Sequence, residues 1–213
     1  LWALGYHQRR WSYADAHELR TLAAEFRRRG IACDALWLDI DYMDRFRVFT
    51  VDERAFPDLA GLTDELRALG FRSVAILDPG VAVESELAAE GLERGLFVQD
   101  AEGEPVRGRV WPGECHFPDF TDARTRAWWA GHVREFLERV RLDGLWSDMN
   151  EPSVFDVPER TLASDCRHAG LDGARGASDT HARWHNLYGQ LMVEATRAGI
   201  EAAHPERRPF LLT

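Results

Sequence analysis

The sequence contains no lysine, so its 26 Lys and Arg positions are all arginine. We interpret this absence as a compositional bias of the genome, without functional meaning. Acidic residues number 36, and the net charge of -10 argues against nucleic-acid binding, which needs clustered cations. No apolar run approaches the roughly 18 residues of a membrane-spanning helix. The composition therefore predicts neither a nucleic-acid partner nor a membrane.

Cysteine is also scarce. Cys33, Cys115 and Cys166 are odd in number and widely spaced, so they fit neither a disulfide framework nor a CxxC metal site. Such usage is typical of a reducing compartment. Because no signal peptide precedes the first apolar segment, the sequence favours a cytoplasmic location. We expect neither a metal nor a cofactor.

What the sequence does contain is an alternation of apolar strand candidates and amphipathic helices, which is typical of parallel βα units. Its 213 residues are enough to bury a sizeable core. Apolar residues at helical spacing predict helices over 15–29, 59–69, 123–140 and about 182–204. Apolar runs predict strands over 4–7, 35–40, 73–77, 144–148 and 209–212.

This pattern favours an α/β fold, a partial (β/α)8 TIM barrel, over a dinucleotide-binding fold, because no glycine-rich phosphate loop follows the first strand. A complete barrel has eight strands in roughly 250 residues, and about five parallel strands are predicted here. Both ends of the chain read as apolar strands, so we expect 1–213 to be one partial barrel domain cut from a longer protein. A long insertion after the third strand, 81–121, is expected to contain a hairpin.

Acidic and aromatic residues follow the predicted strands at 7–11, 39–44, 78 and 146–151. The active sites of (β/α) barrels lie at the carboxyl ends of their strands. These positions therefore form the candidate site.

The stretch GLWSDMNEPSVFD, 144–156, begins as a buried strand and then presents carboxylates. Strand alternation places Trp146 and Asp148 on one face, where an indole beside a carboxylate suits the apolar face of a sugar ring. Glu151 lies beyond the strand and is expected to orient its neighbours. The alternative is that Asp148 or Asn150 only caps the following turn.

The second strand ends in WLDIDYMD, where Asp39 and Asp41 are two residues apart and are expected to share a face. An EF-hand loop is excluded, because Asp44 and Thr50 stand where that loop needs Gly and Glu. A DxDx[TV] phosphatase motif is excluded because Met43 replaces Thr or Val. Two acids that accept hydrogen bonds from substrate hydroxyls fit best, and a solvated loop is the alternative.

Two features receive a purely structural interpretation. His181 and His185 have a spacing that metal ligands can use, but the Glu that a metalloprotease needs is absent, so we interpret them as helix-surface residues. Trp128 and Trp129 are adjacent in a predicted helix, and at most one of them is expected to face the core.

Six blocks of the sequence, in order over essentially the whole chain, resemble the catalytic barrel of glycoside hydrolase family 31, whose best-known members are retaining α-glucosidases. The string WxDMNEP is the most specific of these similarities. The resemblance implies cleavage of α-glucosidic bonds of oligosaccharides through a covalent glycosyl-aspartate. The blocks are GYHQRRWSY (5–13), WLDIDYMD (37–44) followed by Phe49 and Thr50, ILDPGV (76–81), VWPG (110–113), FPDF (117–120) and GLWSDMNEPSVF (144–155).

By this resemblance Asp148 is the catalytic nucleophile and Glu151 supports it. The general acid/base Asp, the rest of the barrel and the flanking β-domains are implied to lie outside 1–213, so the piece alone is expected to be inactive. The residues implied to bind or line the substrate are Trp11, Asp39, Asp41, Val81, Trp111, Trp146, Met149 and Phe155.

One departure from the family pattern is Arg9, which stands where many relatives carry Cys, and we expect no consequence from it. Three alternatives stay open. They are a non-catalytic carbohydrate-binding barrel, an α-xylosidase or α-transglucosidase with the same machinery, and an enzyme that uses Asp39 and Asp41 as metal ligands.

Overall fold

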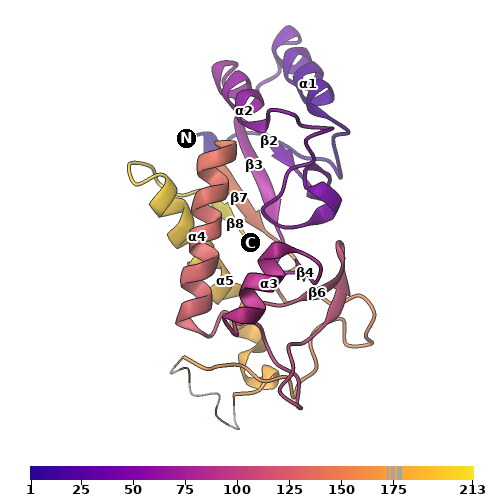
Figure 1. Cartoon of the computed structure of the whole chain (residues 1–213). Helices are drawn as coiled ribbons and strands as arrows, with labels where there is room; N and C mark the ends of the chain where they lie inside the picture. Colours follow the sequence, from indigo (N-terminus) through magenta and orange to yellow (C-terminus); the bar gives the residue numbers. More distant parts are fainter. Residues whose placement is uncertain (172, 174–175, 177–178) are drawn as a thin grey trace. The chain divides into compact units, whose positions relative to one another are not determined.

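The computed structural model describes residues 1–171, 173, 176 and 179–213 (Figure 1). The chain divides into two compact units. The first unit contains Leu1–Leu77, Val133–Trp146 and Ile200–Leu212, and the second contains Asp78–His132, Ser147–Gly199 and Thr213. None of the helices in the described residues has the length and apolar character needed to cross a lipid bilayer.

The main sheet has five parallel strands in the order β1-β2-β3-β7-β8, and Figure 1 shows β2, β3, β7 and β8 running side by side. Each strand pairs with the next one of this sheet along the chain, which is the order of a (β/α) barrel; a dinucleotide-binding sheet reverses its order. The predicted partial TIM barrel is confirmed. The strands are β1 (His7–Gln8), β2 (Ala35–Leu38), β3 (Arg72–Leu77), β7 (Gly144–Ser147) and β8 (Leu211–Leu212).

The inner strands are apolar on both faces, as expected of a parallel sheet covered by helices. All four residues of β2 are buried, and so are all residues of β3 except Arg72. The predicted first strand is misplaced, because Trp2–Leu4 forms a 3-10 helix, η1, and β1 begins only at His7. Leu1 and Leu4 are fully or largely exposed, and Trp2 alone of this segment packs against the core, beside Phe210.

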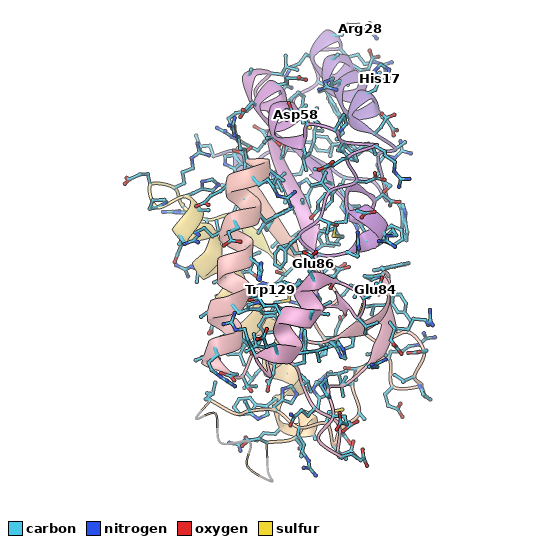
Figure 2. The ribbon with its side chains drawn as sticks, in the orientation of Figure 1. His17, Arg28, Asp58, Glu84, Glu86 and Trp129 are labelled. Carbon is cyan, nitrogen blue, oxygen red and sulfur yellow. The ribbon has the colours of Figure 1, made fainter. Side chains whose placement is uncertain are left out.

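Helices α1 (Ala16–Arg28) and α2 (Leu59–Ala68) belong to the first unit, and each begins at an aspartate. The Asp15 carboxylate accepts a hydrogen bond from the Glu18 amide, and Asp58 does the same for Gly61, both at 2.8 Å. Such caps satisfy amides that have no partner within the helix. Figure 2 shows His17 and Arg28 pointing outward from α1, whereas its buried face carries Ala16, Leu19 and Ala23.

The second unit contains an antiparallel sheet in the order β4-β6-β5, made of Val81–Ala82, Gly113–His116 and Gly108–Val110. Before β5 the chain turns tightly, because the Asp100 amide donates to the Glu104 carbonyl at 2.8 Å. The sequence did not predict helix α3 (Glu86–Glu93) in this insertion. Two short 3-10 helices, η2 (Ile40–Tyr42) and η3 (Asp44–Phe46), follow β2 in the first unit.

Helices α4 (Ala123–Val140) and α5 (His181–Ala203) are the longest in the chain, and both contribute residues to the core of the second unit. Phe120 contacts Trp129 and Tyr188 edge to face, with 5.3 Å between ring centroids in each pair. The Trp129 indole, labelled in Figure 2, donates to Thr196 Oγ1 at 2.9 Å. The expectation for Trp128 and Trp129 is wrong, because both are buried. Neighbouring side chains on a helix can both be covered when different elements pack on each.

Candidate functional site

Asp39 follows β2 directly and is buried, with 8% of its side chain exposed. Its Oδ1 accepts a hydrogen bond from the Ile40 amide at 2.9 Å and so caps η2. Its Oδ2 accepts a hydrogen bond from the Arg9 guanidinium at 2.8 Å. A buried carboxylate needs such donors to stay ionised. The end of β2 therefore presents a charged acceptor that Arg9 partly neutralises.

Trp146, in β7, lies beneath the same guanidinium. The Arg9 Cζ atom is 4.3 Å from the centre of the Trp146 ring, a cation–π distance. Trp146 in turn packs against Trp37, with ring centroids 6.0 Å apart. The first unit thus brings together two predicted site residues, Asp39 and Trp146, through an arginine that the sequence had not selected.

Asp41 does not join Asp39. It is half-buried and accepts a hydrogen bond from the Ser12 hydroxyl. The expectation of a shared face is wrong, because the chain enters η2 directly after Asp39 and strand alternation stops there. Trp11, beside Ser12, lies in the loop after β1 with 64% of its surface exposed. Among the described residues, no three His, Cys, Asp or Glu side chains are placed to hold a metal ion.

In the second unit, Asp148 follows β7 directly and is half-buried. The chain turns at once, because Met149 adopts a left-handed conformation with φ of 57° and its carbonyl accepts from the Ser153 amide at 3.0 Å. The Asn150 amide group donates to the Thr213 hydroxyl at 3.0 Å instead of capping that turn. The turn leaves Asp148 at the very end of the strand.

The loop that follows Asp148 is fixed by β5 and its neighbours. The Phe155 amide donates to the Arg109 carbonyl at 2.8 Å, and the Phe155 ring meets Trp111 edge to face at 4.9 Å. These two predicted lining residues are therefore in contact. Glu151 is exposed and accepts from the Ser153 hydroxyl at 2.8 Å.

Val81 is the least exposed of the predicted lining residues. Its side chain is fully buried in β4. Strand β4 pairs with β6, and Val81 lies opposite His116 in that pairing. Its role as a lining residue stays a prediction.

A buried chain of hydrogen bonds in the second unit involves residues that the sequence analysis placed elsewhere or passed over. His168 Nδ1 lies 2.9 Å from Asp119 Oδ1, and His168 Nε2 lies 3.0 Å from His181 Nδ1. His181 Nε2 continues to His185 Nδ1 at 3.1 Å. The helix-surface interpretation is wrong for His181, which is buried, and His185 is half-buried. His181 and His185 have a recognisable spacing, but Asp119 and His168 lie too far away in the sequence for a spacing rule to find them.

The pKa values of Asp119 and His181 in this series of hydrogen bonds depend on burial and on the neighbouring groups. Burial lowers the pKa of His181 to about 3, and the neighbouring His168 and His185 act in the same direction. Burial alone would raise the pKa of the Asp119 carboxyl, but hydrogen bonds from His168, Thr121 and Ala169 hold it below its ordinary value. The arrangement therefore favours an ionised aspartate and an uncharged His181.

Acid is expected to weaken this region. In the folded chain His181 takes up a proton only near pH 3, whereas an unfolded histidine does so at about 6.5. Stability is thus greatest above pH ~6.5 and falls as the pH drops from there, by up to ~1.4 kcal/mol per pH unit. Hydrogen exchange of peptides covering 179–185, corrected for intrinsic rates, measures this loss. His181→Gln should remove the decline between pH ~6.5 and ~4, above the range in which Asp119 contributes, and His17→Gln should not; a decline that persists in this range in His181→Gln would contradict the assignment.

The whole chain, residues 1–213, matches the family model described as the glycosyl hydrolases family 31 TIM-barrel domain. The chain belongs to glycosyl hydrolase family 31. It is 42% identical to Alpha-glucosidase 2 of Bacillus thermoamyloliquefaciens, and the match covers 100% of this chain and 26% of the length of that protein. The family resemblance of the sequence motifs is thereby confirmed.

Solved family 31 structures agree with this assignment. The family 31 alpha-glucosidase from Bacteroides thetaiotaomicron is 38% identical with a TM-score of 0.80, over 100% of this chain and 33% of that one. A glucosidase II alpha subunit is 30% identical with a TM-score of 0.88, over 99% of this chain and 23% of that one. The chain thus spans about a quarter to a third of the relatives that it matches.

Proposed function

We propose that the protein containing this chain is a retaining α-glucosidase in which Asp148 is the nucleophile. The observation that carries the proposal is the position of Asp148, directly after β7 in the string WSDMNEP of a family 31 barrel. Residues at this end of a barrel strand are the usual source of catalytic groups. The relatives named as α-glucosidases support the substrate class.

In this mechanism the ionised Asp148 carboxylate attacks the anomeric carbon while the glycosidic oxygen leaves. A second carboxyl group, about 5 Å away and supplied from outside 1–213, protonates that oxygen. The bond to the leaving oxygen breaks as the bond to Asp148 forms, and an ester results. Water, deprotonated by the second carboxylate, then releases the sugar with its original configuration.

Asp39 would bind the sugar, because its buried carboxylate can accept hydrogen bonds from hydroxyl groups. Hydrogen bonds of this kind that strengthen in the transition state contribute to catalysis. Aromatic side chains would supply the apolar walls that sugar rings prefer. Asp41, whose carboxylate accepts a hydrogen bond from the Ser12 hydroxyl, stays a proposed substrate contact. The proposed lining residues are Trp11, Trp111, Trp146, Met149 and Phe155.

Trapping of the covalent intermediate tests the proposal. The whole protein is incubated with a fluorinated glucosyl donor, which forms the ester quickly and hydrolyses slowly. Digestion and mass spectrometry should find the added sugar on the peptide that contains Asp148, at close to one label per chain. An Asp148→Asn sample is the control and should carry none. A label on another carboxylate, or no label at all in an active preparation, would contradict the assignment.

A further inference from the structure

Arg9 is the residue of the candidate site that departs from the family pattern. It follows β1 directly, and its guanidinium donates to Asp39 Oδ2 at 2.8 Å. The two side chains differ in exposure, with 8% of Asp39 and 50% of Arg9 accessible to solvent. Arg9 therefore lies on the open side of the buried carboxylate, where a ligand approaching Asp39 would meet it.

The position of the guanidinium is held from below. Its Cζ atom is 4.3 Å from the centre of the Trp146 ring. Trp146 packs on Trp37, which is buried and whose indole donates to His7 Nδ1 at 3.1 Å. Because Trp146 packs on the core of the first unit, it gives the guanidinium a fixed support. Stacking on a fixed ring reduces the entropy that a long side chain loses on binding.

The Arg9–Asp39 pair supplies two kinds of hydrogen bond at one place. A carboxylate can only accept hydrogen bonds, and a guanidinium has five N–H donors and no acceptor. Arg9 uses one of its nitrogens on Asp39. A hydroxyl group both donates and accepts, so it can be satisfied fully by such a pair. The pair is neutral overall, which suits an uncharged sugar better than an anionic one.

We propose that Arg9 is a specificity-determining residue of the sugar site. Asp39 accepts the proton of one substrate hydroxyl, and the Arg9 guanidinium donates a hydrogen bond to the oxygen of that hydroxyl or of the adjacent hydroxyl on the ring. The inference rests on the proposed function. It deepens that function by assigning to this chain a donor that a cysteine at position 9 could not provide, since a thiol is short and a weak donor.

Arg10 offers a matched control. It is the neighbouring arginine in the sequence, and it also pairs with a carboxylate, donating to Glu18 Oε1 at 3.0 Å. Both members of that pair are exposed, at 59% and 36%. Replacing Arg10 removes the same charge from the same loop without touching Asp39 or Trp146. Arg9→Met keeps most of the side-chain length and the contact with the indole, and Arg9→Lys keeps one donor group.

The test uses the whole protein and measures kcat/KM for an aryl α-glucoside and for its 2-, 3-, 4- and 6-deoxy analogues. Arg9→Met is expected to lower kcat/KM for the parent glucoside about 10- to 100-fold, the range of a charge-assisted hydrogen bond. It should also lose discrimination against one or two adjacent deoxy analogues, because the missing hydroxyl is the one that Arg9 contacts. Arg9→Lys should recover part of that discrimination. Arg10→Met should stay within about twofold of the unmodified protein.

The outcomes separate the inference from the function on which it rests. An equal loss on the parent glucoside and on every analogue in Arg9→Met would mean that Arg9 only maintains the fold, and would overturn the inference. Rates and ratios that both stay unchanged would overturn it as well. In both cases turnover by the unmodified protein leaves the proposed function standing. No turnover of any aryl α-glucoside by the unmodified protein would overturn both.

Discussion

Asp148→Asn in the whole protein is expected to lower kcat on an α-glucoside by roughly 10⁴-fold or more, the size of effect seen when a catalytic nucleophile is removed. The amide of asparagine cannot attack the anomeric carbon to form the ester. The variant would therefore bind the substrate without cleaving it. Asp148 is half-buried at the end of β7, and asparagine has nearly the same shape, so the fold should persist. Steady-state kinetics together with circular dichroism measure the two effects separately.

Glu151→Gln is the matched control for that experiment. Glu151 is three residues further on, is exposed, and binds the Ser153 hydroxyl in the same loop. Because its expected role is to orient neighbours, the loss of activity should be below about tenfold. If Asp148→Asn kept near-normal rates, or if Glu151→Gln proved the more damaging change, the nucleophile would have to be assigned to another residue.

Asp119→Ala is expected to give the largest loss of stability among single changes in the second unit. The Asp119 carboxylate is fully buried and accepts hydrogen bonds from the Thr121 hydroxyl at 2.7 Å and from the Ala169 amide at 2.5 Å, besides its contact with His168. Removing it leaves several buried donors without an acceptor, at a cost of about 3–5 kcal/mol. Hydrogen exchange of the peptide covering 165–171 should therefore accelerate at least about 100-fold at neutral pH.

Asp122→Ala is the control, because it measures the loss of stability when another buried aspartate of the second unit is removed. Asp122 is also buried, but it caps α4 by accepting from the Arg124 amide at 2.8 Å, and its ion pair is with the exposed side chain of Arg124. Its replacement should cost only about 1 kcal/mol, the usual loss of a helix cap. Equal losses in the two variants would show that the donors around Asp119 find other partners.

The approximate positions of β2, β3, β7 and β8 could be predicted from sequence, because a buried parallel strand such as β3 is an apolar run that ends at a charged residue. The rule that barrel sites lie at carboxyl strand ends selected Asp39 and Asp148. It applies equally to Arg9, which directly follows β1.

Other parts of the site depend on long-range contacts that no local pattern contains. Val81 is named only through the family motif, and no local pattern indicates that it is fully buried in β4. His181 has no local signal of burial, and it contacts His168, whose own partner, Asp119, is 49 residues away from His168. The expected pairing of Asp41 with Asp39 fails because η2 begins at Ile40, and strand alternation ends there.

The Asp119 anchor also constrains the order in which the chain can become ordered during synthesis. Its bonds to His168 and Ala169 close a loop of about 50 residues, and Asp148 lies inside that loop. A ribosome adds roughly 5–20 residues per second, so several seconds separate the appearance of Asp119 from that of Ala169. During that interval the proposed nucleophile and its turn are already translated, whereas the hydrogen bonds that close the surrounding loop at Asp119 cannot yet form.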